Sequence, residues 1–129
     1  MGTSRSINPK NIAPPAANYV HGVLSAGTGS WLHTSGVVPV ASDGSTPDSI
    51  EDQSACVWAN IGVILTEAGM DPADIVSVTT YVVVGEPLMP VMAARDAALG
   101  GHMAASTLVT VPALARPEWR MEVAIIASR

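Results

Sequence analysis

Hydrophobic residues recur with a helical period in two segments of the chain. Between residues 50 and 68 they follow the three- and four-residue spacing of one helix face. Asp48 or Ser49 can cap the start of this segment, and Gly69 suits a left-handed helix end. A second segment, residues 88–99, has the same spacing, begins among prolines and is followed by two glycines. The sequence therefore predicts two helices.

Alternating and β-branched residues predict strands in the rest of the chain. Residues 75–84 distribute valine, threonine and serine side chains between two faces, which is typical of a central strand. Residues 106–111 and 119–127 predict the last two strands. Residues 19–24 and 31–37 flank a glycine-containing turn and predict an antiparallel hairpin.

The order of these elements, ββαβαββ, predicts the fold class. It favours an α+β fold in which two helices cover one face of a mostly antiparallel sheet of about six strands. A chain of 129 residues forms one domain, residues 1–129, of which residues 1–17 lack any period and are expected to form an N-terminal arm. The second sheet face needs a cover, and with 48% hydrophobic and 13% charged residues the sequence predicts a ring-like oligomer.

Charge and cysteine content exclude several classes of function. Only six Lys and Arg residues and a net charge of -5 leave no basic stripe for a phosphate backbone, so we expect no nucleic-acid partner. The single cysteine, Cys56, has no intramolecular partner and is expected to be a small buried hydrophobic residue. No signal-peptide pattern and no apolar run near 20 residues are present, so we expect a cytoplasmic protein without a membrane span.

No motif for covalent, nucleotide or metal chemistry stands out. The serines lie in no nucleophile-elbow pattern, and the glycines near residue 28 lack the length and lysine of a phosphate loop. His21 and His33 could face each other across the predicted hairpin, but a metal site needs a further ligand. We therefore predict no metal and no cofactor.

Four blocks of the sequence resemble those of the RidA (YjgF) family in their order and spacing, and the resemblance extends from Asn8 through nearly the whole chain. The blocks are Asn18–Val23, Thr34–Val40, Asp74–Val82 and Met121–Ala127. The resemblance implies a chorismate-mutase-like fold and a homotrimer with three clefts between subunits. It also implies hydrolysis of reactive enamines and imines, such as 2-aminoacrylate, to a keto acid and ammonia.

The resemblance also implies which residues form the cleft. Tyr19 and Glu122 match family positions and are the expected catalytic residues. The expected lining of the cleft is Tyr19, Ser35, Gly36, Ala105, Ser106 and Thr107.

The sequence departs from the family pattern at the residues that hold the substrate. Ala105 stands where the family has an arginine that grips the substrate carboxylate, and Ala124 stands where it has a late glutamate. Thr107 replaces the usual cysteine, and the usual asparagine of the second helix falls near Met92. Either another cation binds the carboxylate or the ligand is different.

Three arginines are candidates for the substitute cation. Arg95 lies on the apolar stripe of the second predicted helix, where its stem can pack and its head can pair with an acid instead. Arg116 and Arg120 lie near the last strand, where a solvated loop or strand edge is the alternative to substrate binding.

The sequence therefore predicts RidA-like deamination of a small imine or carboxylate-bearing metabolite by a self-assembled homotrimer. The alternative is a trimer that binds a small molecule or stabilises proteins without catalysis. A ribonuclease activity is disfavoured by the acidic charge balance.

Overall fold

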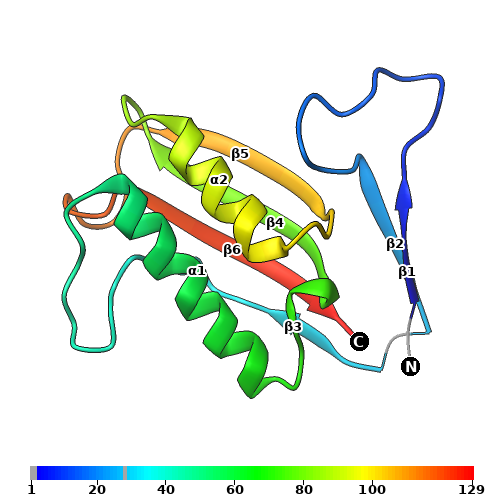
Figure 1. The fold of residues 1–129 in the computed structure, drawn as a ribbon, viewed down its shortest axis with the longest axis horizontal. Coiled ribbons are helices and arrows are strands. Elements are labelled where there is room, and N and C mark those ends of the chain that lie inside the picture. Colours follow the sequence, from blue (N-terminus) through cyan, green and yellow to red (C-terminus); the bar gives the residue numbers. More distant parts are fainter. Residues whose placement is uncertain (1–2, 28) are drawn as a thin grey trace.

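The computed structural model describes residues 3–27 and 29–129 (Figure 1). Its elements are β1 (Thr3–Ile7), β2 (Gly22–Ala26), β3 (Trp31–His33), α1 (Ile50–Glu67), a 3-10 turn (Pro72–Asp74), β4 (Ile75–Val83), α2 (Leu88–Leu99), β5 (Ala105–Val111) and β6 (Met121–Ser128). The predicted α+β class and both predicted helices are confirmed. Within this part of the chain, no helix is long and apolar enough to cross a membrane.

The main sheet has four strands in the order β3-β6-β4-β5. Strand β6 is antiparallel to both β3 and β4, whereas β4 and β5 are parallel and are joined through α2. A strand–helix–strand connection returns the chain in its original direction, so this pair has to be parallel. The predicted six strands and mostly antiparallel pairing are confirmed, but the prediction of a single sheet is wrong, because the strands divide between two sheets.

The remaining two strands form a separate antiparallel ribbon beside the main sheet, as Figure 1 shows. Strand β1 pairs with β2 from Thr3↔Ala26 to Ile7↔Gly22, so the expected N-terminal arm contains a strand. The predicted hairpin between residues 19–24 and 31–37 is not formed, because β2 pairs with β1 and β3 pairs with β6. Residues 1–2 of the expected arm lie outside the described residues.

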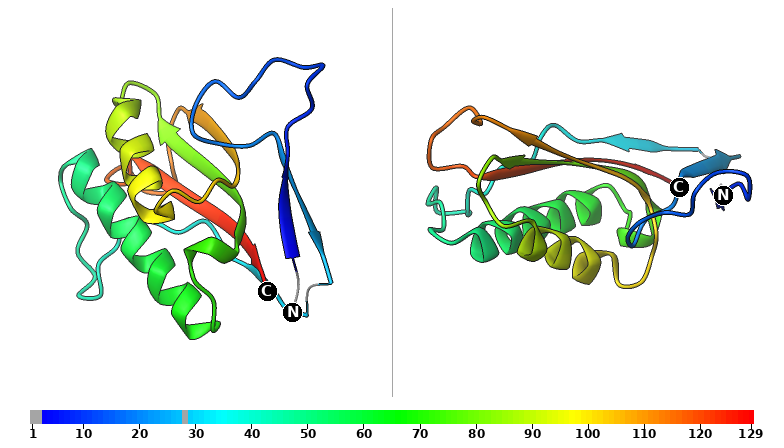
Figure 2. Two further views of the ribbon diagram at one scale, coloured as in Figure 1. Left: turned by 45° about the vertical axis from the view of Figure 1, so that its right-hand side comes forward. Right: turned by 90° about the horizontal axis from the view of Figure 1, so that it is seen from above.

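Both helices pack against one face of the main sheet (Figure 2, right). The alternation predicted for β4 is confirmed, since Val78, Thr80 and Val82 are buried while Ser77 and Tyr81 on the opposite face are half-exposed. The best-buried core side chains are aliphatic or Met: Val57, Ile61, Leu65, Val78, Val82, Val91, Met121, Val123 and Ile125. The core therefore forms between the helices and one sheet face, and the other face carries the more polar side chains.

Local signals fix the ends of the helices. Of the two candidate caps, Ser49 is used: its hydroxyl accepts a hydrogen bond of 3.0 Å from the Asp52 backbone N–H. Gly69 has a φ of +72° and follows α1, as its position predicts. Gly100 caps α2 in the left-handed conformation. These ends set where β4 and β5 begin, and both strands contribute to the site.

Candidate functional site

The sheet face opposite the helices carries the residues that the resemblance singles out. We call it the open face, because neither helix covers it (Figure 2, right). Cross-strand pairing places paired residues on the same face. The open face includes His33, Ser77, Thr79, Tyr81, Ala105, Thr107, Val109, Glu122, Ala124 and Ile126.

At one end of the open face the chain at Tyr19 meets the start of β5. The Val20 backbone N–H donates to the Ala104 carbonyl at 3.2 Å, and Val20 forms a parallel bridge with Ala105. Tyr19 is half-buried, and its hydroxyl accepts a 3.4 Å hydrogen bond from the Ala16 backbone. The structure therefore brings two of the expected site residues, Tyr19 and Ala105, into neighbouring positions. Together with Thr107 they form the Tyr19–Ala105 group.

At the other end a glycine packs against an acid. Val37 pairs with Val123 through hydrogen bonds of 2.7 and 3.1 Å, and this pairing brings Gly36 over Glu122. A Cβ atom on Gly36 would overlap the Glu122 carboxylate, so only glycine fits beside it in this arrangement. Glu122 is half-buried and has no ion-pair partner among residues 3–27 and 29–129. Ser35, Gly36 and Glu122 form the Gly36–Glu122 group.

The two groups lie far apart within one chain. Ala105 is level with Ser77 and Ile126, whereas Glu122 is level with Tyr81 and Val109. Ala105 and Glu122 are therefore separated by two spacings between strands and by four residues along the strands, which corresponds to a distance of about 16 Å. A ligand of a few heavy atoms cannot contact both groups of one chain, but two copies can bring one group of each together.

Arg95 and Ser106 lie on the opposite side of the sheet from these groups. Arg95 is 5% exposed, and its Nη1 donates to the Ser106 hydroxyl at 3.2 Å. Its Nε and Nη2 donate to one carboxylate oxygen of Asp96 at 3.1 and 3.0 Å. The expectation that Arg95 and Ser106 share a surface with Ala105 and Thr107 is therefore corrected. Successive residues of β5 point to opposite faces, and Ser106 points toward the helices.

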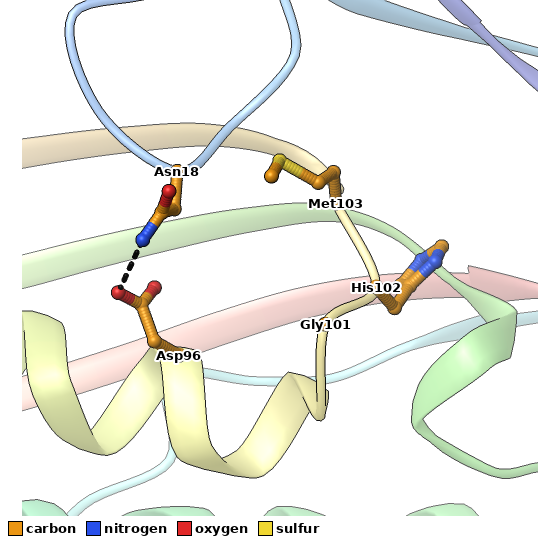
Figure 3. Close-up of a pocket in the computed structure, with 5 residues that line it drawn as sticks. All are labelled: Asn18, Asp96, Gly101, His102 and Met103. Atoms are coloured by element: carbon orange, nitrogen blue, oxygen red, sulfur yellow. Dashed lines mark hydrogen bonds between the residues drawn. The ribbon is translucent and has the colours of Figure 1, made fainter.

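Asp96 also connects the buried arginine to the segment that carries Tyr19. The Asn18 side chain donates to the second Asp96 carboxylate oxygen at 3.0 Å, while His102 points away and its Nε2 lies 2.7 Å from the Ile75 carbonyl oxygen (Figure 3). These residues line a pocket of about 210 Å³, whose lining is Asn18, Asp96, Gly101, His102 and Met103. A chain of polar contacts thus joins α2, β5 and the residue before Tyr19.

Asp96→Ala is expected to lower the free energy of unfolding by about 2–4 kcal/mol, because it leaves a buried guanidinium without its acid. Arg95→Met is expected to lower the free energy of unfolding by less. The methionine side chain fills the space of the arginine stem, and Asp96 keeps its contacts with Asn18 and with water. Urea unfolding of both variants measures the difference. A larger loss for Arg95→Met than for Asp96→Ala would contradict this account.

The other two candidate arginines are paired near the segment before β6. Arg120 lies 3.2 Å from the Glu86 carboxylate through its Nη1 atom. Arg116 lies 3.8 Å from the Glu118 carboxylate, and its guanidinium is 5.7 Å from the centre of the Trp119 ring. Neither contacts the Tyr19–Ala105 group of its own chain.

The histidines and the cysteine do not form a cluster. The ring of His21 lies 2.6 Å from the Ala13 carbonyl oxygen, and His33 stacks on Trp31, so the two histidines do not face each other across a hairpin. The structure, over the residues it describes, contains no group of three or more His, Cys, Asp or Glu side chains that could hold a metal ion. Burial, followed by the charge of Asp43, raises the pKa of the half-buried Cys56 thiol, which disfavours the reactive thiolate.

Comparison with known proteins identifies the family. The family model described as Endoribonuclease L-PSP matches residues 10–129. A solved structure of the Rid-family protein YyfB from Yersinia pestis, described as a protein of unknown function, is 32% identical, covers 98% of both chains and superposes with a TM-score of 0.89. The chain belongs to the Rid/YjgF family.

Other solved structures share the fold at lower identity. The YjgF gene product of E. coli is 27% identical over 97% of this chain and 98% of its own, with a TM-score of 0.71. E. coli TdcF, solved with bound serine, is 22% identical over 97% and 98% of the two chains, with a TM-score of 0.72. No curated protein matches the sequence significantly.

Proposed function

We propose that this Rid/YjgF protein hydrolyses small reactive imines and enamines in clefts between the subunits of a homotrimer. The observation that carries the proposal is the division of the open face into two half-sites. The Gly36–Glu122 group and the Tyr19–Ala105 group lie about 16 Å apart in one chain. A complete site therefore needs one group from each of two copies.

Hydrolysis of an imine requires few protein groups, because the imine carbon is already electrophilic. A water oxygen adds to the electrophilic imine carbon, and the C=N electron pair moves to nitrogen. A proton passes from the added water to nitrogen, the C–N bond breaks, and ammonia leaves as the carbonyl forms. The Glu122 carboxylate is suited to accept the proton of the attacking water, and the Tyr19 hydroxyl is suited to orient the substrate nitrogen. Atoms and electrons balance without an oxidant, a reductant or a cofactor.

The apolar content of the open face supports the trimer. Because no helix covers this face of the sheet, its apolar side chains remain partly in contact with water: Val109 is 40% exposed and Ile126 is half-buried. A closed ring of identical subunits would remove these side chains from water. Sedimentation equilibrium is expected to give a mass of three chains at micromolar concentration.

Tyr19→Phe is expected to lower the turnover of an imine about tenfold, because it removes one oriented hydroxyl and keeps the ring. Imines are generated in the assay by an amino-acid or amine oxidase, and ammonia and carbonyl release are compared with a protein-free control. The variant's mass and thermal midpoint are expected to match those of the wild type. Equal turnover by the two proteins would remove Tyr19 from the mechanism, and no acceleration of any imine would defeat the proposal.

A second candidate function is small-molecule binding without catalysis. It is favoured by the two alanines, Ala105 and Ala124, which leave the open face without the charged side chains found in the family at these positions. Ligand-dependent shifts of the thermal midpoint, together with no turnover of any imine, would support this alternative.

A further inference from the structure

The fixed charge available to the proposed cleft is negative. Glu122 is the acid of the open face and has no ion-pair partner within the part of the chain that the structure describes. Apart from His33, which pairs with Ile126 at the far end of the face, the side chains that share this face with it carry no ionisable acid or base that is charged near neutral pH: Ser77, Thr79, Tyr81, Thr107, Val109, Ala124 and Ile126. A ligand beside Glu122 therefore meets a carboxylate and, from the same chain, no arginine or lysine side chain that would balance its charge.

Four of the six cationic residues are held by contacts with their own chain. Arg95 is buried on the helix side of the sheet and bound to its neighbouring acid. Arg120 continues the line of β6 but is paired with Glu86, which is itself largely buried. Arg129 donates to the Gly69 carbonyl at 2.9 Å. Arg116 pairs with Glu118 at 3.8 Å and lies against the Trp119 ring, so none of the four has an unpaired guanidinium to offer a substrate carboxylate.

The remaining two cations, Arg5 and Lys10, are exposed. Arg5 is on the separate ribbon, and Lys10 is in the loop that follows β1. Among the described residues, no cationic side chain is held in a fixed orientation beside Ala105, where the family has its arginine. A bidentate grip on a carboxylate requires such an oriented guanidinium.

We infer that the substrate is an imine or enamine without a carboxylate, of the kind formed by oxidation of a primary amine. This inference rests on the proposed function and narrows it. The protonated iminium form is both the more electrophilic species and a cation, so Glu122 attracts it and repels an α-imino acid. The reaction is R–CH=NH₂⁺ plus water giving the aldehyde and ammonium: the C–O bond forms, the C–N bond breaks, and the water protons end on nitrogen.

The test compares two imines that differ only in the carboxylate. A flavin amine oxidase acting on isoamylamine yields the carboxylate-free imine, and an amino-acid oxidase acting on leucine yields its carboxylate-bearing counterpart. Each rate is corrected for hydrolysis in protein-free solution. The wild-type protein is expected to accelerate hydrolysis of the isoamylamine-derived imine at least tenfold more than that of the leucine-derived imine.

Two substitutions on β5 form a matched pair for this test. Ala105→Arg supplies the guanidinium that the family uses and is expected to raise the rate with the leucine-derived imine at least tenfold. Thr110→Arg adds the same charge at an exposed position of the same strand, on the opposite face of the sheet, and is expected to give no such gain. Gel filtration checks that each variant keeps the wild-type assembly.

The outcomes separate this inference from the proposed function. If the wild-type protein accelerates neither imine, the hydrolase proposal fails and the inference fails with it. If it accelerates both equally, or the leucine-derived imine more, the hydrolase proposal stands and the inference is overturned. Loss of that second activity in Arg116→Gln or Arg120→Gln would identify the cation that had taken the place of the family arginine.

Discussion

Gln53→Leu is expected to lower the free energy of unfolding by about 3–5 kcal/mol, because it leaves three backbone groups without partners. Gln53 is 1% exposed and lies in α1. Its amide nitrogen donates to the carbonyls of Pro47 and Glu118 at 2.9 and 2.8 Å, and its oxygen accepts the Arg120 backbone N–H at 3.0 Å. One side chain thus fastens α1 to the loop before it and to the segment that leads into β6.

The measurement is urea or guanidinium unfolding of the assembled protein at a fixed protein concentration. Thr66→Leu is the matched control, because it makes the same kind of change at an exposed position of α1 whose hydroxyl bonds only within the helix. It is expected to change stability by less than about 0.5 kcal/mol. A similarly small change in Gln53→Leu would show that water or a rearranged loop satisfies the three groups.

Gly36→Ala is expected to reduce imine turnover about 100-fold while the fold and the assembly persist. The added methyl group overlaps the Glu122 carboxylate. Because the overlapping atoms belong to the end of a flexible side chain, the carboxylate swings away and the backbone stays in place. A displaced acid can no longer position the attacking water, and losses of this size are typical for a misplaced catalytic group.

A double-mutant cycle tests whether the loss acts through Glu122. The variants Gly36→Ala and Glu122→Gln are expected to be non-additive, so the double variant turns over imine no more slowly than the slower single variant. Gly62→Ala is the control, because its added methyl group meets no atom within 4 Å and replaces a glycine inside a helix. It is expected to keep full turnover and to gain slightly in stability. Full activity in Gly36→Ala would falsify the assignment of Glu122 to the reaction.

The helices and the core face were predictable from the sequence because their signals are local. The spacing of apolar residues located α1 and α2, and the residue types Ser49 and Gly69 located the ends of α1. The alternation along β4 separated Val78 from Ser77 without knowledge of any partner strand. Each of these features depends on residues within a few positions of one another.

Strand pairing was harder to predict, since it depends on partners distant in the sequence. A glycine-containing turn between residues 19–24 and 31–37 favours a hairpin, but β2 finds its partner in β1 and β3 finds its partner in β6. The last strand was predicted to start at Trp119 and starts at Met121. The Trp119 N–H is bonded to the Arg116 carbonyl and the Arg120 N–H to the Gln53 side chain, so neither donor is free for a strand partner.

Within the candidate site, too, some features follow from local sequence patterns and others depend on contacts between distant segments. Alternation along β5 already indicates that Ser106 points opposite to Ala105 and Thr107, so its place on the helix side could have been read from the sequence. The closeness of Gly36 and Glu122 could not, because it arises from a single bridge between Val37 and Val123. No local pattern marks a contact between residues so far apart in the chain.

The position of β6 has a consequence for how the protein is made. Strand β6 lies between β3 and β4 and is the last element of the described chain to leave the ribosome. Until it emerges, β3 has no strand partner, whereas β4 can pair with β5, α1 can pack on α2, and the separate ribbon can form. Completion of the main sheet therefore waits for its last strand in chain order, and the apolar undersides of α1 and β3 stay available to chaperones until β6 has formed.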